Sequence, residues 1–385
     1  MLTDTFFSRL GGLAASPRRL SLLLAGAGAA AAAAYLLSVA YRRRRGGGRS
    51  IRGAGGAARR RALRLSVTSA EPLLRLLEQT CRDEPSELPV VCQFGDTKCR
   101  LVMKNRRRVL EKLQSLMSGG PDALEVITDF DHTLSKFSEN GRRVPSSHGI
   151  MESYPDLSAE DHKYFRELYT KYYAIEICPD MSDEEKLPHM IEWWTRSHDR
   201  MVLAGFQKSV LAQTVDVSGV ALRDGWHQFF DRLEELGIPC LIFSAGIGDI
   251  IQEILVHFDI RGKLIRVVSN FMLYNEKGVL RGFSEPLIHT FNKRFSAFAS
   301  SEASANDLVG ATDRRHVLLM GDTMGDLRMS EGCNADLVLT VGYLNDRVQD
   351  RLSGYADKFD IVCLEDHSLC VPLAVIEAAA TGGTA

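Results

Sequence analysis

The chain has 385 residues, of which 45% are hydrophobic and 25% are charged, and its formal net charge is −2. This composition is ordinary for a globular protein, and the length allows two or three domains. The near-neutral charge and the lack of aromatic residues among the N-terminal arginines give no case for polymeric nucleic acid as a partner. The eight cysteines include no CxxC pair. They predict free thiols and no zinc site, although Cys92 and Cys99 are near enough in sequence to pair.

An apolar segment near the N-terminus, residues 20–41, has no charged side chain. A helix of about this length, at roughly 1.5 Å per residue, spans a bilayer core. Arg42–Arg45 follow directly, so the positive-inside rule predicts an anchor in the endoplasmic reticulum or another membrane, with the downstream chain in the cytosol. The main alternative is a cleaved mitochondrial presequence, because the region is rich in Arg and Ala. A third interpretation is an Ala-rich tail with little role.

Residues 46–64 are mostly Gly, Arg and Ala, which indicates a flexible linker. We therefore assign residues 1–65 to an anchor or targeting segment and its linker. Two helices are expected next, over Pro72–Arg82, which opens on a proline, and over Cys99–Met117, which ends before two glycines. With the first core strand they make up residues 66–135.

That strand is Leu124–Thr128, an apolar run that ends at Asp129 and Asp131. Buried parallel strands deliver polar side chains to the carboxyl edge of an α/β sheet, where such folds place their sites. In an extended backbone both carboxylates would point the same way. One could then attack while the other handles a proton, with a divalent cation reducing their repulsion. The alternative is a strand end with two solvated aspartates.

Helices are expected over Ala159–Ala174, over Ser182–Ser197 and near Val210, which makes residues 136–222 a helical insert. Residues 223–385 then return to strands. Cys240–Phe243 leads into Ser244, Ala245 and Gly246, where small residues that open a helix expose N–H groups to an anion. Further strands are expected at 265–268, 317–320, 337–341 and 359–364, with a hairpin turn at 275–278. Strands alternating with helices predict an α/β fold with a doubly wound, mainly parallel sheet.

Four strand-edge signals occur in order along the chain: Asp129-x-Asp131-x-Thr133, Ser244, Lys293, and Gly321-Asp322-x-x-Gly325-Asp326. Together they resemble the haloacid dehalogenase (HAD) superfamily of aspartate-nucleophile phosphatases. Other segments are similar to the cytosolic type III 5′-nucleotidases, which include pyrimidine 5′-nucleotidases and 7-methylguanosine-phosphate-specific enzymes. These segments are 171–176, 192–198, 243–249, 268–272 and 342–347. The resemblance covers roughly residues 101–378 and implies a HAD-like core with the helical insert as its cap.

By this resemblance Asp129 is the nucleophile, which takes the phosphoryl group as an aspartyl-phosphate. Asp131 is the general acid for the leaving oxygen and then the base for water. Ser244 and the N–H of Ala245 would bind phosphoryl oxygens, and Lys293 would neutralise their charge. Without the resemblance, both aspartates would still be assigned, whereas Lys293 could equally be a surface lysine.

The cofactor that the resemblance implies is Mg²⁺, which suits an oxygen-rich site. Its protein ligands would be Asp129, the main-chain carbonyl of Asp131, and Asp322. Asp326 would support the site by holding the lysine or a metal-bound water, and Thr133 is a second supporting residue.

Glu176 and Ser197 occupy the positions where the family contacts the nucleoside. A carboxylate accepts from an exocyclic amine, which suits cytosine or a guanine edge. Trp194, Trp193 or Tyr173 could stack on the base, and a cationic methylated guanine would favour such a face.

The sequence therefore predicts a Mg²⁺-dependent 5′-nucleotidase for CMP, UMP and/or 7-methyl-GMP, a monomer with possible phosphotransfer to a second nucleoside. It does not choose between the pyrimidine and 7-methylguanosine branches. One alternative is a phosphatase for another small phosphate ester, and another is a catalytically silent nucleotide-binding scaffold. His132, next to the acid, could be an extra proton donor or a surface residue.

Overall fold

The computed structural model describes residues 65, 67–81, 85–154, 156–178, 180–294 and 314–382. They fall within one compact unit, Gly55–Ala385. The apolar segment 20–41 and the linker 46–64 lie outside the described residues, so the membrane anchor stays a prediction. Within the described ranges, no helix is both long and apolar enough to cross a bilayer.

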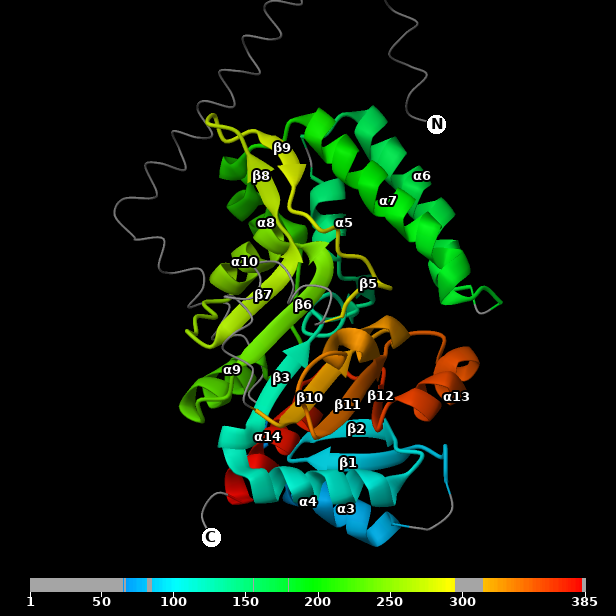
Figure 1. Cartoon of the computed structure of the whole chain (residues 1–385), viewed down its shortest axis with the longest axis vertical. Coiled ribbons are helices and arrows are strands. Elements are labelled where there is room, and N and C mark those ends of the chain that lie inside the picture. The colour runs from blue at the N-terminus through cyan, green and yellow to red at the C-terminus, as the bar shows by residue number, and fades with distance from the viewer. Residues whose placement is uncertain are drawn as a thin grey trace, which may run out of the picture. The chain divides into compact units, whose positions relative to one another are not determined.

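The described residues form a central eight-stranded sheet in the order β1-β2-β12-β11-β10-β3-β6-β7 (Figure 1). Strands β12 to β7 in this order run parallel, and β1 and β2 extend one edge as an antiparallel hairpin. The bounds are β1 Val90–Phe94, β2 Thr97–Val102, β3 Leu124–Thr128, β6 Cys240–Ile247, β7 Ile265–Asn270, β10 His316–Gly321, β11 Leu337–Leu344 and β12 Ile361–Leu364. The expected mainly parallel α/β sheet is confirmed.

Two short antiparallel pairs lie outside this sheet: β4 (Ser138–Glu139) with β5 (Arg142–Arg143), and β8 (Met272–Tyr274) with β9 (Leu280–Phe283). The β8–β9 pair confirms the hairpin expected around 275–278. Around the sheet lie helices α3 Glu71–Thr80, α4 Arg106–Ala123, α9 Trp226–Glu235, α10 Gly248–His257, η2 Met324–Ser330, α13 Val348–Lys358 and α14 Cys370–Gly382. The insert contributes α5 Ser147–Glu152, α6 Ala159–Glu176, α7 Asp183–Ala204, η1 Lys208–Val210 and α8 Leu211–Ser218, with α6 and α7 side by side in Figure 1.

Alternate residues of the central strands pack on opposite faces of the sheet. On β12, Ile361 and Cys363 join the large core cluster that includes residues of α4 and α14, whereas Val362 and Leu364 pack with residues of α13. This period of two is the geometry of a strand that is buried on both faces. The sheet is therefore covered by helices on both sides, as expected for a doubly wound fold.

The helix expected over Cys99–Met117 is wrong in its first part. Thr97–Val102 form β2, and α4 begins only after its N-cap Asn105. From Lys98 to Leu101, exposed and buried residues alternate, so this short stretch has the period of a strand rather than that of a helix. All eight cysteines are free, including Cys99, whose register partner across the hairpin is another cysteine.

A buried arginine ties the loop after β3 to the rest of the core. Arg223 is 1% exposed, and its guanidinium carbon lies 3.8 Å from the centre of the Tyr343 ring. It donates hydrogen bonds of 2.6 Å to the main-chain carbonyls of His132 and Thr133, and a further one to the carbonyl of Asp366. The conformation of the loop after β3 therefore depends on a side chain that lies about ninety residues further along the chain.

We expect Arg223→Met to lower the free energy of unfolding by about 3 to 5 kcal/mol, because several buried carbonyls would lose a charged donor. Urea denaturation measures this loss. The control is Arg315→Met: Arg315 makes an exposed two-pronged ion pair with Asp336, and such pairs contribute about 1 kcal/mol or less. Equal losses in the two variants would contradict the role given to Arg223.

Candidate active site

The carboxyl ends of β3, β6 and β10 bring the expected site residues together. Asp129 and Asp131 follow β3, Ser244 lies within β6, and Asp322 follows β10. A cavity of about 510 Å³ lies beyond these strand ends and is also lined by residues of α5, α6 and α7. The residues expected for catalysis, phosphate binding, metal binding and nucleoside contact all line it: Asp129, Asp131, Glu176, Ser197, Ser244, Ala245, Lys293, Asp322 and Asp326.

Lys293 lies between two carboxylates at the base of the cavity. Its Nζ is 2.6 Å from Asp129 Oδ1 and 2.6 Å from Asp326 Oδ1, and the residue is 3% exposed. Burial lowers the pKa of Lys293, but the two carboxylates outweigh burial and the pKa is raised overall. The ammonium group is therefore held in its charged form inside the site, and Lys293 is not a surface lysine.

The carboxylate of Asp326 is already occupied by hydrogen bonds from the protein. Oδ1 accepts from Lys293, while Oδ2 accepts from the N–H groups of Asp322 and Thr323 at 3.1 and 2.9 Å and from the Thr323 hydroxyl at 2.9 Å. A Cβ at Gly321 would lie 2.4 Å from Asp326 Cβ, so the first glycine of the motif leaves room for this side chain. Asp326 thus shapes the turn after β10 and holds Lys293.

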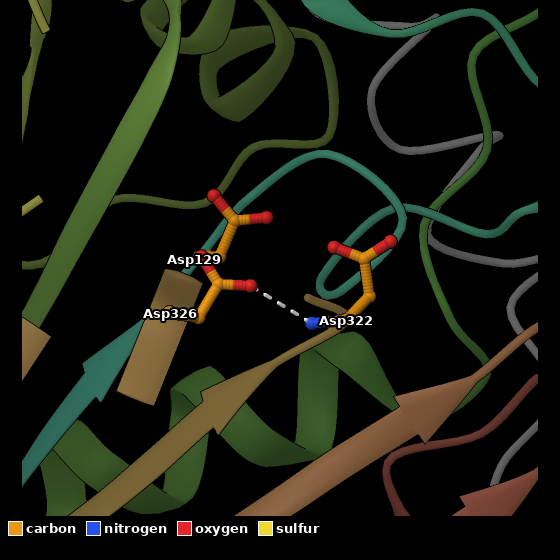
Figure 2. A group of neighbouring side chains, drawn as sticks. All are labelled: Asp129, Asp322 and Asp326. Atoms are coloured by element: carbon orange, nitrogen blue, oxygen red, sulfur yellow. Dashed lines mark hydrogen bonds between the residues drawn. The ribbon is translucent and has the colours of Figure 1, made fainter. Parts of the chain in front are cut away.

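Asp129, Asp322 and Asp326 form an acidic cluster that suits a divalent cation (Figure 2). One carboxylate oxygen from each lies within 4.8 Å of the others. Burial raises the pKa of Asp322 well above its usual range, and the neighbouring Asp129 adds to this rise. Carboxylate oxygens are the ligands that hard cations such as Mg²⁺ prefer, and a cation would offset the repulsion that Lys293 leaves uncompensated. Hydrolases of the HAD superfamily generally use Mg²⁺, and this donor set fits that ion.

Asp131 does not pair with Asp129 but turns toward the insert. Both of its carboxylate oxygens accept hydrogen bonds from Ser147, from the N–H at 2.8 Å and from the hydroxyl at 2.6 Å. Burial raises the pKa of Asp131, and the hydrogen bonds from Ser147 oppose that rise. β3 ends at Thr128 and a turn follows, so the two carboxylates are separated by a turn and not by extended backbone.

Thr133 lies in the same turn and does not line the cavity. It is fully buried, its N–H donates to the carbonyl of Phe130, and its own carbonyl accepts from Arg223. These contacts are consistent with a supporting residue. His132 has φ 64° and faces the cavity. Burial lowers the pKa of His132 to about 4, so its imidazole is neutral at neutral pH. This protonation state does not favour the interpretation of His132 as an extra proton donor.

The expected phosphate loop is joined to the cap by a tryptophan. Ser244 Oγ accepts from the N–H of Gly246 at 3.0 Å, and the carbonyl of Ala245 accepts from Trp194 Nε1 at 2.8 Å. Asn270 Nδ2 donates to the same carbonyl at 2.9 Å. The ring N–H of Trp194 is therefore committed to the core, which fixes the ring plane at the edge of the cavity.

Each expected nucleoside contact has a partner that sequence reasoning missed. Glu176 accepts from the Thr290 hydroxyl at 2.8 Å, and the Ser197 hydroxyl donates to Glu152 at 3.0 Å. Thr290 comes from the loop after β9 and Glu152 from the end of α5. Neither residue stands in a motif or directly after a strand, so the sequence gives no signal for it. The same holds for Ser147.

Aromatic side chains form a further wall. Tyr173 stacks on Tyr169 with ring centres 4.9 Å apart, and Trp193 stacks on Tyr172 at 5.9 Å. Trp193, Trp194, Tyr169 and Tyr173 all line the cavity. The wall is apolar and electron-rich, and it lies on the same cavity as the Glu176 carboxylate.

A parallel α/β sheet with these acidic strand ends, a buried lysine between two of them and a helical insert after the first strand defines a hydrolase of the HAD superfamily. The sequence profile of the pyrimidine 5′-nucleotidase (UMPH-1) family matches residues 132–380. The chain belongs to this family and is a phosphoric monoester hydrolase of the 5′-nucleotidase type.

Named relatives agree with this assignment. The human 7-methylguanosine phosphate-specific 5′-nucleotidase is 43% identical over 275 residues, which cover 71% of this chain and 90% of the relative. A Caenorhabditis elegans protein named putative cytosolic 5′-nucleotidase 3 is 36% identical over 296 residues, covering 75% and 78%. The crystal structure of cytosolic 5′-nucleotidase IIIB bound to cytidine superposes with a TM-score of 0.69 at 32% identity, covering 80% of this chain and 98% of that one.

Glu152 predicts a pH dependence of stability. Burial raises the pKa of Glu152 from 4.5 to about 7, against the effect of its hydrogen bond from Ser197. The folded protein holds the proton of Glu152 more tightly than the unfolded chain does. Protonation of Glu152 therefore stabilises the fold fully below pH 4.5, and this stabilisation is lost as the pH rises through 7. Between pH 4.5 and pH 8, the wild type should lose about 3 kcal/mol of stability relative to Glu152→Gln, because the glutamine does not titrate.

Urea denaturation at pH 4.5, 6 and 8 measures this difference. The exposed substitution Glu167→Gln controls for the loss of one surface charge. A Glu152→Gln advantage that stays constant across this pH range would contradict the prediction.

Proposed function

We propose that this enzyme hydrolyses nucleoside 5′-monophosphates, with CMP and 7-methyl-GMP as better substrates than UMP. The observation that carries the proposal is one cavity lined by two kinds of groups. Asp129 with Lys293 and Asp131 suit phosphoryl transfer, while Glu176 and stacked aromatic rings line the same cavity. A human relative is named for 7-methylguanosine phosphate, and a solved relative was crystallised with cytidine.

In the first step, Asp129 attacks phosphorus and the bond to the 5′-oxygen of the nucleoside breaks. Asp131 gives a proton to that oxygen, so the nucleoside leaves as a neutral alcohol and an aspartyl-phosphate remains. Lys293 stays beside the attacking carboxylate and counters the negative charge of the phosphoryl oxygens. Ser244 and the N–H of Ala245 bind those oxygens from the other side.

In the second step, water attacks the phosphorus of the aspartyl-phosphate. Asp131, now a carboxylate, takes a proton from the water, and inorganic phosphate leaves Asp129 free. A second nucleoside could replace water as the attacking alcohol, which would give a phosphotransferase side reaction.

Mg²⁺ would be held by the side chains of Asp129 and Asp322 and by the main-chain carbonyl of Asp131. When bound, it supplies charge compensation for the phosphoryl group and for the acidic cluster. Asp326 is proposed as a support rather than a ligand, because its Oδ2 accepts three hydrogen bonds from the turn after β10 and its Oδ1 holds Lys293.

The base would lie between the aromatic wall and Glu176. A carboxylate there accepts from the exocyclic amine of cytosine or guanine, whereas uracil presents a carbonyl at the matching position. Ser197 lies on the same cavity and would contact the nucleoside. A small ester such as phosphoserine would leave these groups unused, and a silent scaffold would not need Asp129 and Lys293 in contact.

We propose that the catalytic unit works in the cytosol, in keeping with the names of the nematode relative and of the solved relative. A tether formed by residues 20–41 remains part of this proposal.

The test of the function is phosphate release, with Mg²⁺, from CMP, 7-methyl-GMP, UMP, GMP, AMP and phosphoserine. We expect release from CMP or 7-methyl-GMP to fall by about 10³-fold or more in Asp129→Asn, because the amide is not a nucleophile. If the wild type hydrolysed phosphoserine as fast as CMP or 7-methyl-GMP, the proposed recognition of the base would be contradicted. Activity that survives in Asp129→Asn would contradict the aspartyl-phosphate.

Metal binding is tested separately by thermal unfolding with and without Mg²⁺. At about 100 times its Kd, Mg²⁺ should stabilise the wild type by about 2.7 kcal/mol, and Asp322→Asn should lose most of this gain. The control is Asp350→Asn, since Asp350 forms an exposed ion pair with Arg347 near the cavity rim. A full Mg²⁺ response in Asp322→Asn would remove Asp322 from the ligand set.

A further inference from the structure

Ser147 is the first residue of α5 and is fully buried. Its N–H donates to Asp131 Oδ1 at 2.8 Å, and its hydroxyl donates to Asp131 Oδ2 at 2.6 Å. One residue therefore holds both oxygens of the carboxyl group that would exchange protons with the leaving group and with water.

The Ser147 hydroxyl is itself fixed in direction. Its oxygen accepts from the N–H of Ile247 at 3.1 Å. A hydroxyl has one hydrogen, and because Ile247 supplies its own, the hydrogen of Ser147 is directed at Asp131. Ile247 is the last residue of β6, the strand that carries Ser244. Ser147 thus links the proposed acid to the strand of the proposed phosphate loop.

Gly246 shows that the structure makes room for this contact. A Cβ at Gly246 would lie 2.0 Å from Ser147 Oγ and 2.9 Å from Asp131 Oδ2. Any larger residue at this position would displace the Ser147–Asp131 pair. The pairing is therefore supported by two segments that are far apart in the sequence, α5 and the end of β6.

We propose that Ser147 is a positioning residue that holds Asp131 in place for both proton transfers. The inference rests on the proposed function, in which the P–O bond to the nucleoside breaks as Asp131 protonates the leaving oxygen. Hydrogen bonds to an ionised acceptor are stronger than those to a neutral one. Ser147 therefore stabilises the carboxylate that this transfer leaves behind and that later takes a proton from water. Each carboxylate oxygen has a second lone pair, so Ser147 does not block the proton.

A positioning role and a purely structural role differ in their dependence on the leaving group. A nucleoside is a poor leaving group and needs a proton, whereas the nitrophenolate of p-nitrophenyl phosphate leaves without one. A misplaced Asp131 therefore slows the first step for nucleotides selectively. Damage to the fold would slow both substrates alike.

The experiment compares full-length wild type and Ser147→Ala with Mg²⁺ and with enzyme in excess, so that the first step alone is observed. The substrates are p-nitrophenyl phosphate and whichever of CMP and 7-methyl-GMP the wild type hydrolyses. We expect nucleoside release to slow by about tenfold to a hundredfold and nitrophenolate release by about threefold at most. Equal slowing of both, or no slowing of either, would overturn the proposal.

The matched control is Ser146→Ala, one residue earlier. Ser146 caps α5 by accepting from the N–H of Gly149 and makes no hydrogen bond to Asp131, so its loss should leave the ratio of the two rates unchanged. If Ser147→Ala does not fold, Ser147→Cys keeps a similar shape with a larger sulfur atom and a weaker donor, and it should show the same selective loss. A wild type without Asp129-dependent release would instead mean that the proposed function has failed, which this comparison separates from a failure of Ser147.

Discussion

The site depends on holding several carboxyl groups together in a place that water reaches poorly. Burial disfavours the charge on each of them, and their mutual repulsion adds to that cost. Different side chains pair with these carboxyl groups. Lys293 neutralises Asp129 and Asp326, and Ser147 binds Asp131. The remaining carboxylate, Asp322, completes the acidic cluster, and a bound cation would reduce the repulsion within it.

The same constraint explains why the backbone around the site is held so firmly. The turn after β3 includes His132 with φ 64°, a conformation that L-residues adopt at a cost. Arg223 donates hydrogen bonds to the carbonyls of His132 and Thr133, and Asn345 also donates to the carbonyl of His132 at 3.1 Å. A turn of this kind persists only where its surroundings determine it. Here a buried guanidinium does so, and it thereby sets the direction of the neighbouring main-chain carbonyls.

The sequence predicted the parts of the site that follow strand ends. Asp129, Asp131, Ser244 and Asp322 come directly after, or close to the end of, apolar runs, and parallel strands bring their carboxyl ends to one edge. The alternation of predicted strands and helices along the chain predicted the parallel sheet and the helical insert. The β1–β2 hairpin was not predicted: β1 lies outside every predicted helix or strand, and the part of β2 from Cys99 onward was included in the helix predicted over Cys99–Met117.

The residues that sequence reasoning did not find share a different property. Ser147, Glu152, Thr290 and Arg223 act through contacts to residues outside their own helix, strand or loop. A serine or a threonine in a loop is too common to stand out, and its role exists only once the fold has brought its partner near. Such residues become visible when the hydrogen bonds of each motif carboxylate are followed to their donors.

These contacts also divide the insert into two parts with different tasks. Helix α5 packs on β6 and contacts the proposed acid, Asp131, through Ser147. Helices α6 and α7 pack on each other, and polar contacts that include Glu176 to Thr290, Trp194 to Ala245 and Asp183 to Arg328 join them to the core. Ser197 also joins α7 to Glu152 of α5. The groups expected to contact the nucleoside, Glu176 and Ser197, are therefore carried by α6 and α7, whereas the contact to the proposed acid comes from α5.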